Sequence, residues 1–167
     1  MPPTTPASAA AVRDLARRMR ASVDEFTLVD ADGHIPDPPP YSDLLHHLRT
    51  AHQHLVDTVE LATAEATAGG PDRPPGTRER LVLAASDALA ASYLFGHALR
   101  DVLASADIKP HESAIVLAHA GARAELRRGA EALDETAVLL EQHQATAESS
   151  ASMRLPDQPL KRPGPTR

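Results

Sequence analysis

The sequence contains no cysteine and no tryptophan, and it has only two phenylalanines and two tyrosines in 167 residues. Without cysteine, disulfides, thiolate catalysis and cysteine-ligated zinc sites are excluded. Because aromatic residues are so few, the core must consist of leucine, valine and alanine, whose small side chains favour closely packed helices. β-Branched and aromatic residues never alternate with period two, so we expect no strands.

Long apolar runs are missing as well. The beginning of the sequence lacks the continuous apolar segment of a secretory signal peptide, and no long stretch is both strongly apolar and free of charge. We therefore expect a cytoplasmic protein without a membrane-spanning helix. The formal net charge is −6, and only the two ends carry a net positive charge. Such an acidic body argues against nucleic-acid binding, which needs clustered lysine and arginine.

The sequence does contain long segments whose apolar residues recur at alternating spacings of three and four, the pattern of one helix face. The central segment, residues 77–106, follows a Pro-Pro-Gly sequence, and Thr77 is placed to cap its first turn. Its main stripe is Leu81, Ala85, Ala88, Ser92, Phe95, Leu99 and Val102. A second apolar set lies beside this stripe, at Val82, Leu89, Tyr93, Gly96 and Leu103. We expect more than one neighbouring helix to cover a helix of this kind.

Three further helices are predicted on the same grounds, over residues 9–26, 41–68 and 110–144. The first is amphipathic and has Ser8 as its candidate N-cap. The stripe of the second consists of Leu45, Leu48, His52, Leu55, Val59, Ala62 and Ala66. The stripe of the third consists of Ile115, His119, Ala122, Leu126, Gly129, Leu133, Thr136 and Leu140.

These segments predict an all-α fold. Short connections make consecutive long helices antiparallel, so residues 41–68, 77–106 and 110–144 should form an up-down bundle with coiled-coil-like packing. The N-terminal helix, residues 9–26, either docks as a fourth member or stays separate. The predicted domain spans residues 9–144, after a flexible leader at residues 1–8. Residues 145–167 contain several prolines and no periodicity, which is typical of a disordered tail.

Histidine is the one abundant chemically active residue, with nine in the sequence. His52 and His119 occupy stripe positions, and the expected antiparallel connections bring His52, His97 and His119 to about the same height. Three such side chains could bind a first-row transition metal or a haem. However, His97 lies on the opposite side of its helix from the main stripe. The simpler alternative is that His52 and His119 are polar core residues that make packing sensitive to pH.

A further apolar strip on the central segment consists of Leu83, Ala90 and Leu94. We expect the N-terminal helix to cover this strip. If that helix stays away, the strip becomes an interface for a protein partner or for a homo-oligomer.

Motifs for nucleotide binding, hydrolase nucleophiles and zinc proteases are absent from the sequence. The sequence therefore favours a non-catalytic helical bundle without a cofactor. Such a protein would act through protein–protein interaction, as an adaptor, a scaffold or a self-assembly module. The alternative is a metal- or haem-binding bundle that uses His52, His97 and His119.

Overall fold

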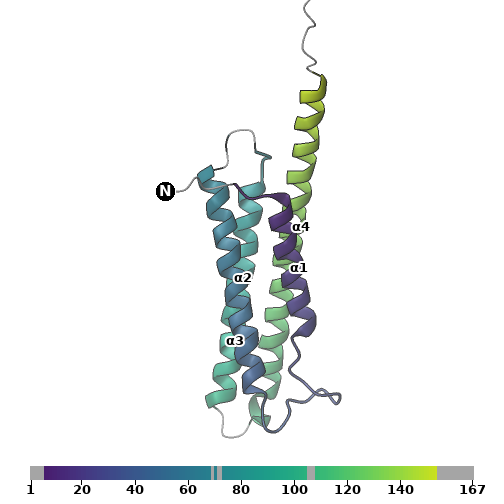
Figure 1. Ribbon diagram of the computed structural model, residues 1–167. Coiled ribbons are helices and arrows are strands. Elements are labelled where there is room, and N and C mark those ends of the chain that lie inside the picture. The colour runs from purple at the N-terminus through teal and green to yellow at the C-terminus, as the bar shows by residue number, and fades with distance from the viewer. Residues whose placement is uncertain (1–5, 69, 71–72, 105–107, 154–167) are drawn as a thin grey trace, which may run out of the picture.

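The computed structural model describes residues 6–68, 70, 73–104 and 108–153. These residues form four α-helices and a short 3₁₀ turn, Lys109–His111, and the described ranges contain no strand. The helices are α1 (Ala9–Glu25), α2 (Tyr41–Ala68), α3 (Thr77–Ala104) and α4 (Glu112–Met153). Consecutive helices run in opposite directions along a common axis (Figure 1). The predicted all-α up-down bundle is thus confirmed.

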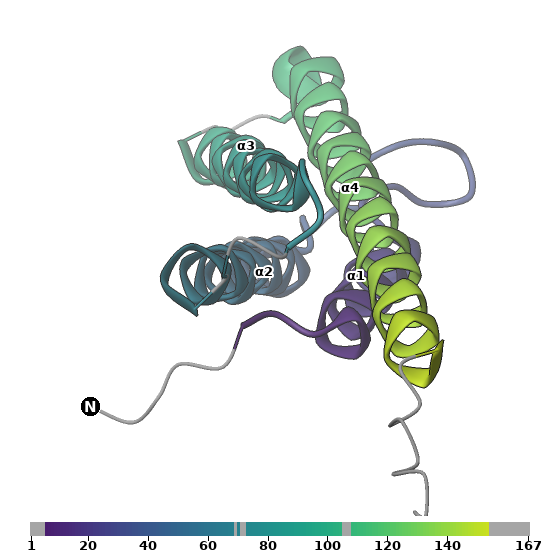
Figure 2. The same cartoon turned by 90° about the horizontal axis from the view of Figure 1, so that it is seen from above.

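α1 is a full member of the bundle. Its first turn is capped by Ser8, whose hydroxyl oxygen accepts a hydrogen bond from the Ala11 amide at 3.2 Å. Its apolar face is buried at Val12, Leu15, Met19, Val23 and Phe26. Seen from above, α1 lies beside α4 and α2 and diagonally opposite α3 (Figure 2).

Ion pairs accompany this docking of α1. Arg13 pairs with Glu141 of α4 at 2.7 Å, and Arg18 pairs with Asp57 of α2 at the same distance. The expectation that the first helix covers Leu83, Ala90 and Leu94 is therefore wrong. The apolar face of α1 is used against α4 and α2, and α1 lies diagonally opposite α3, which carries that strip (Figure 2).

The stripe predicted for α4 is confirmed, because all eight of its residues are buried. Gly129 of α4 faces both α1 and α3. A Cβ atom at this position would lie 2.9 Å from Met19 Cε and 3.3 Å from the Ala84 carbonyl oxygen. Glycine at the centre of the helix therefore allows the backbones to come together.

The stripe predicted for α2 is displaced by one residue. The buried positions are Leu44, His47, Ala51, His54, Thr58 and Glu65, whereas His52 and Val59 are exposed. One residue corresponds to a rotation of about 100° around the helix axis. The prediction failed because four of these buried side chains are polar. They find hydrogen-bond partners inside the bundle, and a search for apolar residues does not detect such positions.

α4 continues past Gln144 to Met153, so the tail predicted from residue 145 begins too early. Residues 145–152 contain neither proline nor glycine, and alanine and glutamate favour a helix even without tertiary contacts. This end of α4 projects beyond the other helices (Figure 1). The remainder of the predicted tail, residues 154–167, lies outside the described residues, as do residues 1–5 of the predicted leader and residues 105–106 of the predicted central helix.

α3 is the one helix among those described whose length and composition would allow it to cross a membrane. In the structure it packs between α2 and α4, with Leu81, Ala88, Phe95 and Val102 fully buried. Core helices of bundles share these properties of length and composition, but only 33% of the apolar window of α3 is buried, so packing accounts for part of its apolar character.

Candidate functional site

The three histidines predicted to form a metal or haem site are not brought together. His52 points outward from α2. His97 is half-buried on α3, where its ring lies 4.3 Å from that of Tyr93 and its Nδ1 atom lies 2.8 Å from Arg100 Nη2. His119 is buried on α4. Among the described residues, no group of three or more histidine or acidic side chains has the arrangement needed to hold a metal ion.

His119 instead faces His47 of α2, and both residues are only 4% exposed. His119 Nε2 lies 3.1 Å from His47 Nδ1, so one imidazole donates a hydrogen bond to the other. Phe95 packs edge-on against His119, with ring centroids 5.3 Å apart, and Phe26 lies 4.3 Å from His47. The sequence missed His47 because it precedes the predicted stripe residue Leu48.

Burial lowers the pKa of His47 and of His119 to about 4. The desolvation of a charged imidazole is the main cause for both, and the nearby Arg123 lowers the two pKa values further. Asp43 acts in the opposite direction on His47, but more weakly than burial. Both imidazoles are therefore neutral at neutral pH, which allows one to act as donor and the other as acceptor.

A third buried histidine, His54, contacts Ser22 across the α1–α2 interface, with 2.9 Å between Nε2 and Oγ. The Ser22 hydroxyl donates to the Arg18 carbonyl oxygen, so it accepts from His54 Nε2. Within the described part of the chain, His54 Nδ1 has no hydrogen-bond partner. The pKa of His54 falls to about 4, mainly through burial and then through the positive charge of Arg18. The buried histidines are thus engaged by neighbours inside the bundle.

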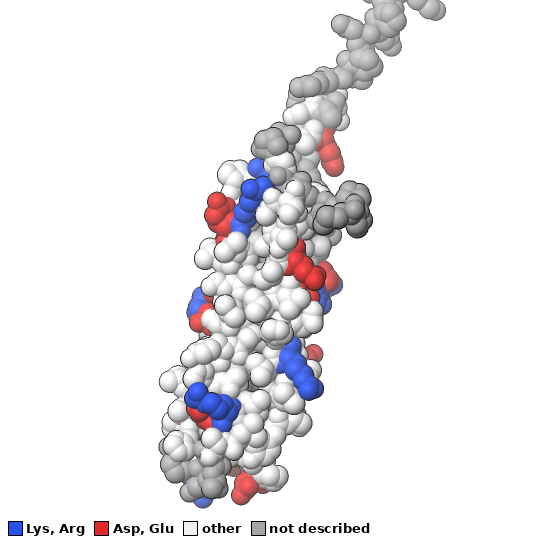
Figure 3. All heavy atoms as spheres, turned by 90° about the vertical axis from the view of Figure 1, so that its left-hand side faces the viewer, with Lys and Arg blue, Asp and Glu red and all other residues white. Residues whose placement is uncertain are grey.

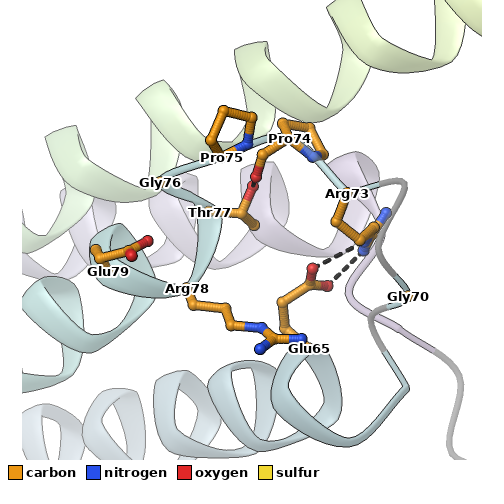
Figure 4. A pocket seen from close by; sticks show the side chains of 9 residues that line it. All are labelled: Glu65, Gly70, Arg73, Pro74, Pro75, Gly76, Thr77, Arg78 and Glu79. Atoms are coloured by element: carbon orange, nitrogen blue, oxygen red, sulfur yellow. Dashed lines mark hydrogen bonds and ion pairs between the residues drawn. The ribbon is translucent and has the colours of Figure 1, made fainter.

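A surface pocket of about 310 Å³ lies at the other end of the bundle, beneath the connection between α2 and α3 (Figure 4). Glu65 is fully buried there, and Arg73 donates to both of its carboxylate oxygens, at 2.8 and 2.5 Å. Arg73 also donates to the Ala7 carbonyl oxygen, just before α1. The charged groups in the pocket thus satisfy one another's hydrogen-bonding capacity. Arg73 acts as a clamp that joins α2, the α2–α3 connection and the start of α1.

Thr77 belongs to the same pocket and corrects a smaller expectation. Its hydroxyl donates to the Pro74 carbonyl oxygen at 2.9 Å. The side chain therefore holds the preceding loop, and Thr77 does not act as the predicted acceptor for the first turn of α3.

The largest unexplained feature is an apolar surface formed by α2 and α3, which we call the outer face. Its residues are Leu45, Val56 and Val59 of α2 and Val82, Leu89, Tyr93 and Leu103 of α3, with exposures between 37% and 66%. Figure 3 shows this side of the bundle, on which charged groups are few and scattered. α3 has the two neighbours that were expected, α2 and α4, but neither of them covers its second apolar set, which is largely exposed.

The predicted interface strip follows a different side of α3. Leu83 is 58% exposed, whereas Ala90 and Leu94 are half-buried. Leu94 packs toward α4, where its Cδ1 atom would lie 3.3 Å from a Cβ added to Gly121. The strip is thus partly covered by α4, and the outer face is the more extensive apolar surface.

Comparisons with known proteins gave no matching family, no matching curated protein and no matching solved structure.

Proposed function

We propose that this protein is a non-catalytic helical bundle that acts by binding protein surfaces, as an adaptor, a scaffold or a self-assembly module. The observation that carries the proposal is the outer face of α2 and α3. Its seven side chains expose roughly 600 Å² of apolar surface, which is at the upper end for the largest patch on a monomeric protein.

The character of the outer face supports binding to protein. It includes an aromatic residue, Tyr93, which is 64% exposed and offers both an apolar ring and a polar hydroxyl. Such residues are enriched in protein interfaces, where charged groups are depleted from the centre. The buried polar groups, in contrast, are used for contacts within the bundle. A cytoplasmic location is part of this proposal.

The alternative of a metal or haem site has less support, because its three candidate ligands lie on different surfaces. His52 is outside the bundle, His97 contacts Tyr93 and Arg100, and His119 is paired with His47. A shared metal would require α2 and α3 to rotate in their packing.

Site-specific photo-cross-linking in cells tests the proposed function. A photoreactive phenylalanine replaces Tyr93 at the outer face, and the control carries it at the exposed Ala120 of α4. We expect discrete protein adducts from position 93 and none from position 120. If position 93 yields no adduct, or if both positions give the same adducts, the outer face is not a binding surface and the proposal is wrong.

A further inference from the structure

Four exposed charges that border the outer face differ in sign between the two ends of the bundle. Arg49 and Arg100 lie toward the end at which α2 begins, whereas Glu60 and Glu79 lie toward the end at which α2 finishes. All four residues are exposed, and Arg100 is also paired with Asp101 of the same helix at 2.8 Å, which offsets part of its charge. The surface between them is mainly apolar and includes the exposed His52 of α2. The neighbouring Arg78 does not alter this pattern, because its side chain is directed toward Glu65 in the adjacent pocket (Figure 4).

The charged pair on α2 and the charged pair on α3 are centred at nearly the same height along the bundle. On α2, the midpoint between Arg49 and Glu60 lies at residues 54–55, and on α3 the midpoint between Glu79 and Arg100 lies at residues 89–90. The rings of His47 and Phe95 are 5.8 Å apart, which sets the relative height of the two antiparallel helices. Residues 54–55 are then about level with residues 87–88, so the two midpoints lie within about one helical turn of each other along the bundle.

We propose that the outer face binds a second copy of this chain, in a two-fold dimer with α2 against α2 and α3 against α3, each pair antiparallel. This inference rests on the proposed function and identifies the partner. A two-fold axis across the helices at the common midpoint places Arg49 opposite the partner's Glu60 and Arg100 opposite the partner's Glu79. The Arg49–Glu60 pair, formed twice, would then border a mainly apolar centre, with a weaker contribution from Arg100, which also pairs with Asp101 of its own helix.

The other face-to-face arrangement is disfavoured by the same charges. An axis parallel to the helices would bring the beginning of α2 in one copy against the same end of the other copy. Arg49 would then approach Arg100, and Glu60 would approach Glu79. Like charges at both ends oppose this arrangement, so the charge pattern selects the antiparallel dimer.

The extent of the outer face suits such a dimer. A stable interface buries about 800 Å² on each partner, and its centre is more apolar than its rim. The roughly 600 Å² of exposed apolar side chain, together with the polar groups around it, reaches that size. Leu89 lies close to the proposed axis and would contact its own copy.

Sedimentation velocity of the full-length chain over a range of concentrations tests this proposal. Leu89→Glu places two carboxylates near the axis, whereas Leu83→Glu is a matched control on the same helix, since Leu89 and Leu83 are 57% and 58% exposed. We expect the wild type to dimerise. Leu89→Glu should weaken dimerisation by about 100-fold or more, and Leu83→Glu by less than about threefold.

Charge exchange then tests the orientation. Arg49→Glu should weaken the dimer by about tenfold, and Arg49→Glu combined with Glu60→Arg should restore it to within about threefold. Failure of the double variant to recover would overturn the antiparallel arrangement. A single-cysteine variant, Leu89→Cys, provides an independent check, because the chain has no other cysteine. It should form a disulfide dimer on oxidation, and Leu83→Cys should not.

The outcomes separate this inference from the proposed function. A wild-type chain that stays monomeric at all concentrations overturns the dimer, as does a dimer that Leu83→Glu dissociates and Leu89→Glu leaves intact. If Tyr93 cross-links only to a different protein, the proposed function stands and the self-association is wrong.

Discussion

His54 donates its Nε2 proton to the hydroxyl oxygen of Ser22, and this contact fixes the tautomer of a buried imidazole. The Ser22 hydroxyl uses its own proton on the Arg18 carbonyl oxygen, so it can only accept from His54. The bare Nδ1 atom therefore faces the interior as an acceptor. A second proton at Nδ1 would add a buried donor and a buried charge at once.

This relationship predicts that stability falls in mild acid. His47, His54 and His119 have pKa values of about 4 in the folded protein, against about 6.5 when unfolded. Stability is therefore unaffected above about pH 6.5 and is lost as the pH falls from there toward 4. Each histidine should contribute a slope of up to about 1.4 kcal/mol per pH unit near pH 5.

Urea unfolding between pH 7.5 and 4.5 measures this slope. His54→Gln should reduce the pH slope of the free energy of unfolding by up to about 1.4 kcal/mol per pH unit, the contribution of one proton. His52→Gln should leave the slope unchanged, because His52 is exposed on the same helix. Arg18 and Asp57 also act on His54, in opposite directions. A wild-type free energy of unfolding that stays constant from pH 7.5 to 5 would contradict the prediction.

The His47–His119 hydrogen bond predicts a non-additive pair of substitutions. Replacing only His119 with leucine leaves His47 Nδ1 buried without its partner, at a cost of about 1–3 kcal/mol. Replacing both with leucine removes both polar groups, so the double variant should be less destabilised than the sum of the single variants. Urea unfolding of the four proteins at pH 7.5 gives the coupling energy, and additive effects would show that the contact is energetically unimportant.

The clamp at Glu65 makes a sharper prediction. Arg73→Met removes the guanidinium that donates to both oxygens of the fully buried Glu65 and leaves only Arg78 directed toward it (Figure 4), so it should cost up to about 3–5 kcal/mol. Adding Glu65→Leu to this variant removes the isolated charge, so the double variant should recover much of the loss. Thermal and urea unfolding at pH 7.5 measure both changes. If Arg73→Met proves harmless, Glu65 does not depend on this pairing.

Two helical glycines should respond oppositely to alanine. A Cβ at Gly96 of α3 meets nothing within 4 Å, so Gly96→Ala should stabilise the protein by about 1 kcal/mol. A Cβ at Gly129 would press on the Ala84 carbonyl oxygen of the α3 backbone. The resulting strain should cancel or exceed the same helical gain. Urea unfolding distinguishes them, and equal stabilisation by both substitutions would show that α3 and α4 move apart easily at Gly129.

The sequence was a good guide where buried residues are apolar. The amphipathic character of α1 and the stripe of α4 were predicted correctly, and α2 begins and ends where its proline- and glycine-rich flanks indicate. The apolar pattern of α2 was misleading, because its outward side carries Leu45, Val56 and Val59 while its inward side carries His47 and His54. Only partners from other helices make these polar residues suitable for a core, and a single sequence does not show those partners.

The same dependence on partners from other helices decided which residues of the candidate sites could be predicted. His119 was identified because it occupies a regular stripe, yet its partner His47 could be recognised only once α2 was correctly rotated. The outer face was visible in the sequence as a second apolar set on α3. Its exposure could not be predicted, since it depends on α1 packing against α4 and α2.

The packing of α1 against α4 also has a consequence for biosynthesis. α1 leaves the ribosome before α2, α3 and α4, yet it finds its main neighbour only when α4 has emerged. Until then, the apolar side chains of Val12, Leu15 and Met19 have no complete binding groove. α2 and α3 can pair earlier as a hairpin, so the growing chain should acquire its N-terminal helix last, as the closing step of assembly.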